Sequence, residues 1–228
     1  MSDFINVVAI VEGKTEQIFV ESVLVPYLAE KMIFMVATQV TKPGQKGGDV
    51  RFERIKKDLG LHLKQRQDTY VTTLVDYYGT KEWPGLHLVS SNARPEQIAA
   101  CINQATKTNV NALFAEQQSE RRFIPYMAIH EFEALLFSDS EILAAELEID
   151  EHKVLDVLEK TGEPEAINNS PQTAPSKRLD EWSKNKKFPK TTLGISIATR
   201  IGVTKIREKC PVFDAWIDSF EAIVAAQA

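Results

Sequence analysis

The sequence has few cysteines and no long hydrophobic run. Only Cys101 and Cys210 occur among 228 residues, and their spacing fits neither a metal site nor a disulfide framework. We therefore expect two buried thiols in a reducing compartment. No apolar run approaches the ~20 residues of a membrane span, and the N-terminus lacks the basic and apolar segments of a signal peptide. These absences lead us to expect a cytoplasmic protein with no membrane partner.

The chain also lacks an excess of basic residues. Its 27 lysines and arginines stand against 32 aspartates and glutamates, which gives a net charge of −5. This balance argues against a protein that binds nucleic acid over its whole surface. It does not exclude a nuclease, because an acidic metal site carries negative charge until its cations bind. The positions of the charges must therefore decide between these classes.

Four segments rich in apolar and β-branched residues predict strands, at 6–11, 33–40, 70–75 and 123–129. Helical patterns at 16–30, at 50–65 and from 94 onward separate them, and Pro26 is expected to kink or end the first of these helices. Alternating strands and helices predict an α/β fold with a mainly parallel sheet flanked by helices. The glycine- and lysine-containing stretch at 41–49 predicts a mobile loop.

The predicted organisation has two parts. Residues 1–137 form the α/β domain, in which the last strand runs directly into a helical pattern at 130–137. Residues 138–228 form a C-terminal helical region of short helices and polar loops, with a longer helical pair at 193–208 and 212–226. We expect one α/β sheet with a helical extension.

Acidic residues follow three of the predicted strands: Glu12, Asp76, and Glu131 with Glu133. The carboxyl ends of parallel strands lie on one edge of a sheet, so these carboxylates should converge. Clustered carboxylates repel one another unless a cation neutralises them, and their hard oxygens suit Mg²⁺ or Mn²⁺. Such ions activate water and stabilise the leaving oxygen in phosphoryl transfer. The alternative is that these acids cap helices, as Glu16 does if it lies in a first turn.

A basic segment at 176–190 concentrates lysines and arginines around Trp182 and Phe188. Lysines neutralise phosphates and aromatic rings stack on unpaired bases, so the segment is a candidate nucleic-acid contact. The alternative is a solvated face with Trp182 packed inward. One lysine from this segment that reaches the acidic edge would stabilise charge in a transition state. His130 precedes Glu131 as in a zinc-protease helix, but Ala134 stands where the second histidine would be, which favours a supporting or core role for His130.

The N-terminal segment VVAIVEGKTE resembles the first motif of the Toprim domain, found in topoisomerases, primases and OLD-type nucleases. Over about residues 5–220 the chain more closely resembles a family of Toprim-like proteins of unknown function from bacteria and archaea. The strings that carry this resemblance are VEGKTEQIFVE, LVDYYGTKEWPG, RFIPYMAIHEFEALLFSD and KKFPKTTLGISIA. Genes of that family often lie beside a gene for an AAA/ABC-type ATPase, as in two-gene anti-phage systems.

The resemblance implies roles for particular residues. Glu12 takes the position of the Toprim glutamate, a general acid/base and metal ligand, with Glu16 as its companion. Asp76 takes the first position of the Asp-x-Asp motif, whereas Tyr78 stands at the second. This departure removes a ligand of the second metal ion, unless Glu131 or Glu133 replaces it.

Lys187 or Lys190 resembles the late catalytic lysine of Toprim nucleases. With these residues the chain is expected to be a Mg²⁺- or Mn²⁺-dependent nuclease, or nuclease-like effector, that acts on DNA or RNA with an ATPase partner. A homodimer is part of the same expectation. The alternative is a non-catalytic Toprim-like module that binds or regulates an ATPase, and a primase-like enzyme is a weaker third possibility.

Overall fold

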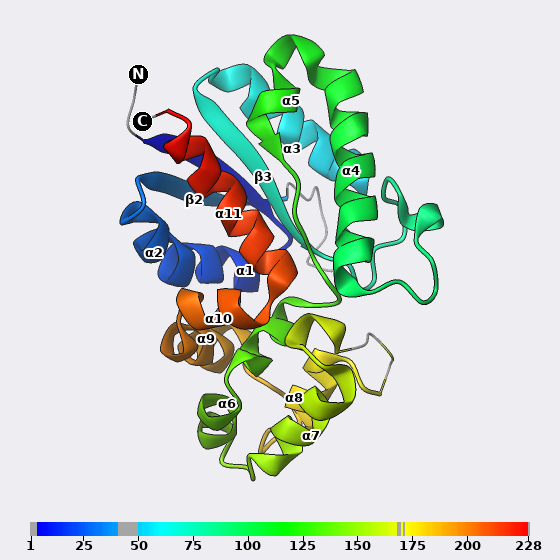
Figure 1. The fold of residues 1–228 in the computed structure, drawn as a ribbon, viewed down its shortest axis with the longest axis vertical. Coiled ribbons are helices and arrows are strands. Elements are labelled where there is room, and N and C mark those ends of the chain that lie inside the picture. Colours follow the sequence, from blue (N-terminus) through cyan, green and yellow to red (C-terminus); the bar gives the residue numbers. More distant parts are fainter. Residues whose placement is uncertain (1–3, 41–49, 168–169, 171, 228) are drawn as a thin grey trace.

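The computed structural model describes residues 4–40, 50–167, 170 and 172–227 of the chain, and the predicted loop at 41–49 lies outside them. A parallel sheet at the centre is flanked by helices (Figure 1). Its strands are β1 (Ile5–Val11), β2 (Ile33–Gln39), β3 (Thr69–Asp76), β4 (Phe123–Ile124) and β5 (Met127–Ala128). The order is β2-β1-β3-β4, and β5 pairs with the end of β3. The prediction of an α/β fold with a mainly parallel sheet is confirmed.

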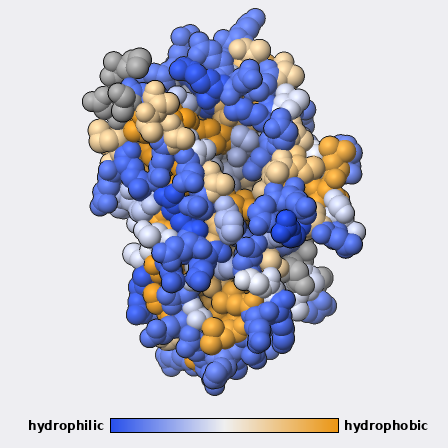
Figure 2. All heavy atoms as spheres, viewed as in Figure 1, coloured by the Kyte–Doolittle hydropathy of each residue, from blue (hydrophilic) through white to orange (hydrophobic). Residues whose placement is uncertain are grey.

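Helices and helical turns join the strands and continue beyond them. The α-helices are α1 (Lys14–Phe19), α2 (Val25–Ala29), α3 (Phe52–Gln65), α4 (Pro95–Phe114), α5 (Ser119–Arg122), α6 (Ser140–Leu147), α7 (His152–Thr161), α8 (Pro175–Trp182), α9 (Ile195–Ile201), α10 (Val203–Lys209) and α11 (Pro211–Ala225). The π-helical turns are η1 (Val20–Leu24) and η6 (Lys190–Gly194), and the 3₁₀ turns are η2 (Leu86–Leu88), η3 (Ala115–Gln117), η4 (Phe132–Ser138) and η5 (Pro164–Ala166). The face shown in Figure 2 is mostly hydrophilic, with a group of hydrophobic side chains over the lower, helical part of the molecule.

The residue pattern of each strand matches its position in the sheet. In β3 every residue before Asp76 is buried, because β3 lies inside the sheet and helices cover both of its faces. At the sheet edge, β2 alternates instead: Ile33 and Met35 are buried, whereas Phe34 and Val36 are exposed. The continuous apolar runs seen in the sequence therefore belong to the covered strands.

Two prolines interrupt regular structure. The sequence predicted an interruption at Pro26 but a continuous strand through Pro125. Pro26 follows the π-helical turn η1, which divides the helix predicted at 16–30, because proline lacks the N–H that continues an α-helical hydrogen-bond ladder. The single strand predicted at 123–129 is wrong: β4 and β5 are separated around Pro125. There the Thr73 hydroxyl accepts from the Tyr126 N–H (3.1 Å) and donates to the Tyr126 carbonyl (2.9 Å), which bridges the gap in the ladder.

Two predicted helices also differ in detail. The helix predicted at 193–208 is split into α9 and α10 at Gly202, whose φ of +79° is a left-handed conformation that glycine adopts without strain. The helical pattern at 130–137 forms the 3₁₀ segment η4, which starts only at Phe132. The change matters for the site, because it leaves Glu131 in extended backbone before the turn.

The last helix, α11, returns to the sheet (Figure 1). The indole N–H of Trp216 donates to the hydroxyl of Thr72 in β3 at 2.9 Å, and the Trp216 ring stacks on Tyr126 with centroids 4.3 Å apart. One hydrophobic core runs from Ile5 to Phe220. The domain boundary at residue 137 stays a prediction, and the helical region is joined to the sheet by this shared core.

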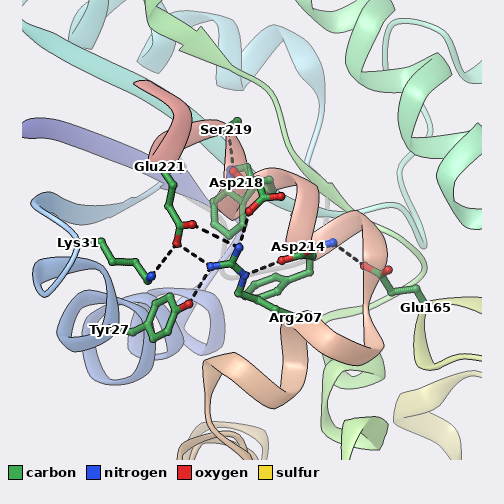
Figure 3. Close-up of polar contacts among 10 residues, drawn as sticks. Tyr27, Lys31, Glu165, Arg207, Asp214, Asp218, Ser219 and Glu221 are labelled. Carbon is green, nitrogen blue, oxygen red and sulfur yellow. Dashed lines mark hydrogen bonds and ion pairs between the residues drawn. The ribbon is translucent and has the colours of Figure 1, made fainter. Parts of the chain in front are cut away.

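An arginine holds α11 against α2 (Figure 3). Arg207 of α10 donates to Asp214 (2.6 Å) and Glu221 (2.6 Å), and it also pairs with Asp218. Its guanidinium reaches the Tyr27 hydroxyl of α2 at 2.8 Å. The surrounding acids raise its pKa further above its already high value, although burial works in the opposite direction. Arg207 therefore stays charged and joins three helices.

A buried glutamate fixes the start of α11. Glu165 of η5 is 1% exposed and accepts the backbone N–H groups of Val212 (2.8 Å) and Phe213 (3.0 Å). Burial raises the pKa of Glu165 from 4.5 to about 7, and the two backbone hydrogen bonds lower it only in part. The helix start is thus held by a carboxyl group that titrates near neutral pH.

The stability of the fold should therefore depend on the protonation of Glu165. Its pKa is raised in the folded state, so its contribution is fully present below about pH 4.5 and is lost as pH rises through about 7. The difference corresponds to about 3 kcal/mol of unfolding free energy. We expect Glu165→Gln to remove this pH dependence, measured by urea unfolding between about pH 4.5 and 8.

Glutamine leaves one backbone N–H without an acceptor, which lowers the unfolding free energy by the same amount at every pH. The slope of unfolding free energy against pH therefore still reports the titration of Glu165. The control is Glu141→Gln, since Glu141 is exposed in the first turn of α6. Equal pH slopes in wild type and Glu165→Gln would show that Glu165 does not titrate in this range.

Candidate functional site

Acidic side chains gather at the carboxyl edge of the sheet, as the sequence predicted. Glu12 directly follows β1, Asp76 ends β3, and Glu131 and Glu133 follow β5. Glu12 Oε2 accepts the backbone N–H of Asp76 at 3.3 Å. Glu16 is buried in the first turn of α1. We call these five residues the acidic cluster.

The backbone around the cluster orients its carboxylates. The Phe132 N–H, at the start of η4, donates to Asp76 Oδ1 at 3.0 Å. A Cβ atom at Gly13 would lie 3.3 Å from Glu16 Oε2, so the missing side chain leaves room for that carboxylate. The turn after β1 and the turn after β5 therefore converge on the end of β3.

The carboxylates of the cluster disfavour one another's ionisation. Burial raises the pKa of Asp76 well above its ordinary 3.8, and the charges of Glu16 and Glu133 raise it further. Glu12 and Glu131 also raise the pKa of Asp76. Burial, and then the charge of Glu12, raise the pKa of Glu16 in the same way, against backbone hydrogen bonds that lower it. Such a group binds a proton or a cation readily.

Lys190 supplies positive charge to the cluster. It lies at the start of η6 and pairs with Glu133, which is 2% exposed. Burial lowers the pKa of Lys190, but the attraction of Glu133, Glu131 and Asp76 exceeds this effect and raises the pKa overall. Burial raises the pKa of Glu133, and Lys190 lowers it. Lys187 is exposed, and no ion pair among the described residues includes it. Of the two candidate lysines, the structure brings Lys190 to the cluster.

Glu131 has a structural role that the sequence did not reveal. Its two carboxylate oxygens accept from the backbone N–H and the hydroxyl of Ser176, each at 2.9 Å. Ser176 lies in the first turn of α8, so Glu131 caps that helix from 45 residues away. This contact joins the C-terminal helical region to the carboxyl edge of the sheet.

The backbone conformation of His130 is a further feature that the sequence did not reveal. Its φ of +66° is a left-handed conformation that is uncommon for a residue with a side chain. Its carbonyl accepts the Tyr78 N–H at 2.8 Å, which fixes the turn after Asp76. Nδ1 is buried without a hydrogen-bond partner among the described residues, and burial lowers the pKa of His130 to about 4. A neutral imidazole therefore packs beside the cluster, 6.0 Å from the Tyr77 ring.

The basic segment at 176–190 is largely occupied by contacts within the chain. Phe188 is 3% exposed, and Trp182 packs on Phe137 with centroids 5.8 Å apart. Lys184 pairs with Glu148 at 2.6 Å, and the Arg178 guanidinium donates to a backbone carbonyl. Phe188 therefore cannot stack on bases in this conformation, and Trp182 is half-buried against the core.

The family of the chain follows from its sequence. A family model described as "Domain of unknown function (DUF4276)" matches residues 11–221, and the chain belongs to that family. Searches of curated proteins and of solved structures find no match. Across the ranges that the structure describes, no helix combines the length and the apolar character needed to cross a membrane.

The contact between Glu131 and Ser176 predicts a stability effect that is separate from any chemistry. Glu131→Ala leaves a buried N–H and a buried hydroxyl without their acceptor, and we expect a loss of about 1–3 kcal/mol of unfolding free energy. Urea unfolding measures it. In a double-mutant cycle with Ser176→Ala, the two losses should not add, because both changes remove one shared contact.

Glu141→Ala is the surface control, with an expected change within about 0.5 kcal/mol. Additive losses in the cycle, or an unchanged stability of Glu131→Ala, would rule out the capping role.

Proposed function

We propose that this DUF4276 protein is a Mg²⁺- or Mn²⁺-dependent nuclease of the Toprim type, which hydrolyses phosphodiesters of DNA or RNA. The observation that carries the proposal is the convergence of Glu12, Glu16 and Asp76 at the carboxyl edge of a parallel sheet. This edge is where α/β proteins bind ligands. The raised pKa of Asp76 supports it, because a cation at this position would relieve the repulsion among the carboxylates.

The donors in the cluster fit a magnesium ion in their chemistry. Within the described residues, no three His, Cys, Asp or Glu side chains form a group that could hold a metal by themselves. Mg²⁺ is commonly bound by one or two carboxylates, with waters and substrate phosphate completing its shell. Glu12 and Asp76 would hold it, with Glu16 beside them. When bound, such an ion lowers the pKa of water and stabilises negative charge on phosphate oxygens.

The chain itself supplies orientation and charge. The Phe132 N–H and the Asp76 N–H fix the carboxylates of Asp76 and Glu12. In this proposal Glu12 would accept a proton from the attacking water. Lys190 approaches from the surface, with 44% of its side chain exposed, and can bind a phosphate oxygen that competes with Glu133. Lys187, nearby and exposed, would contact the nucleic acid outside the reacting phosphate.

The resemblance to Toprim-like families extends the proposal to partners. We infer that the protein works in the cytoplasm with an AAA/ABC-type ATPase, in defence against phage. The net charge of −5 supports a need for such a partner, since the chain has little basic surface of its own with which to hold nucleic acid.

A second candidate function is a non-catalytic module that regulates the ATPase. The observation that favours it is Tyr78, which stands at the second position of the acidic motif and is 37% exposed. Glu131 and Glu133 do not readily replace the missing ligand, because Ser176 and Lys190 bind them. A module of this kind would keep the fold and the partner surface without cleaving nucleic acid.

Metal binding and cleavage test the nuclease. We expect Mg²⁺ or Mn²⁺ to bind the wild type in isothermal titration, and Asp76→Asn to abolish binding while keeping the acceptor for the Phe132 N–H. Metal-dependent cleavage of DNA or RNA should fall by at least about 100-fold in Asp76→Asn and in Glu12→Gln.

Asp68→Asn is the matched control, because Asp68 is exposed at the opposite end of the same strand and pairs with Arg66. Cleavage that persists in both site variants would remove Glu12 and Asp76 from the mechanism.

Binding of the ATPase separates the two functions. If the chain is only a module, co-purification with a candidate AAA/ABC-type ATPase should be equal with EDTA, with Mg²⁺ and in Asp76→Asn, and the complex should cleave neither DNA nor RNA. Metal-dependent cleavage by the complex contradicts the module.

A further inference from the structure

β2 lies at one edge of the sheet. In the described part of the chain, β2 ends the strand order, and only its inner edge pairs, with β1. The seven residues from Ile33 to Gln39 contain no charge, no proline and no glycine. Soluble proteins usually protect such an edge with lysine, proline or a bulge, because its free N–H and C=O groups recruit other strands. The edge of β2 has none of these protections.

One face of the same strand is also apolar and uncovered. Val36 is 60% exposed and Phe34 is 45% exposed, while the Phe4 ring lies 5.4 Å from that of Phe34. α3 packs mainly against β1 and β3. Two large hydrophobic side chains therefore face solvent at a strand edge.

Among the described residues, no acidic one lines the hollow beside β2. This hollow of about 370 Å³ is bordered by Val25 and Ala29 of α2, by Phe34 and Val36, and by the end of α3. Arg66 is the one residue among its lining that carries a permanent charge. An occupant of this surface needs free backbone groups in extended conformation and uncharged side chains.

We propose that the occupant is a second copy of this chain, paired through β2 in an antiparallel arrangement with a two-fold axis at Val36. A two-fold axis perpendicular to the sheet brings the β2 edges of the two copies together and keeps the same face of each sheet on the same side. It makes the two β2 strands antiparallel. In this register Val36 faces Val36, Phe34 faces Thr38, and Met35 faces Ala37. No charged residue meets a like charge, and β-branched and aromatic side chains face each other on the open side.

The pairing has a consequence for the acidic clusters. The strands run in opposite directions across the axis, so the carboxyl edges of the two copies point to opposite ends of one continuous sheet. Each site stays open to its own substrate. The dimer therefore does not depend on the proposed nuclease activity, and either idea can fail without the other.

Light scattering after gel filtration tests the dimer on the full chain. We expect the wild type to have twice the monomer mass and Val36→Lys to have the monomer mass, because two lysines would meet at the axis. Leu88→Lys is the matched control: Leu88 is 63% exposed at the end of η2, and this variant should remain dimeric. A monomeric wild type, or a dimer that persists in Val36→Lys, overturns the proposal.

A pair of cysteine variants decides the case in which Val36→Lys fails to fold, as judged by circular dichroism. Facing residues of an antiparallel pair have Cα atoms about 4.5–5.5 Å apart, within reach of a disulfide. With diamide as oxidant, Val36→Cys should form a covalent dimer, whereas Phe34→Cys should not, because Phe34 faces Thr38. Equal cross-linking of both variants, or none beyond the wild type, contradicts the two-fold at Val36.

Discussion

The end of β3 is the point on which the site and the second half of the chain depend. The backbone N–H of Asp76 binds Glu12, and its carboxylate binds the N–H of Phe132, so one residue ties the turn after β1 to the start of η4. This arrangement places acids where they repel one another. The fold tolerates it because every residue of β3 before Asp76 is buried, so the strand cannot shift to separate the acids. Lys190 offsets part of the repulsion.

The helical C-terminal region completes this edge. Ser176 of α8 binds Glu131, Lys190 of η6 binds Glu133, and α11 crosses back to bind Thr72 of β3 through Trp216. The acids come from the first 137 residues, whereas the serine that binds Glu131 and the lysine that binds Glu133 come from the last 91. The boundary predicted at residue 137 divides the chain in sequence, but the site contains residues from both sides of it.

The sequence was sufficient for the fold class and for the location of the acids. Buried strands in alternation with helices imply a parallel sheet, and residues that end parallel strands share an edge, so Glu12 and Asp76 were placed by local patterns. The left-handed backbone at His130 was not predictable, because histidine has no preference that marks it. The contact between Glu131 and Ser176 was not predictable for another reason. The two residues are 45 positions apart, and the path of the intervening chain determines whether they meet. Lys187 and Lys190 are three positions apart, and only the structure shows which of them reaches Glu133.

The buried acids of this protein fall into two groups that the sequence does not distinguish. Glu165 and Glu131 each have both oxygens bound by donors at the start of a helix, so hydrogen bonds offset part of the cost of their burial and they hold the fold together. Asp76 accepts one hydrogen bond among the described residues and lies among four other carboxylates. A carboxylate with few donors and many like charges around it is stabilised by a proton or a cation. That difference separates the helix-capping glutamates from Asp76, and it is why the proposed metal is assigned to Asp76 and its neighbour Glu12, with Glu16 beside them.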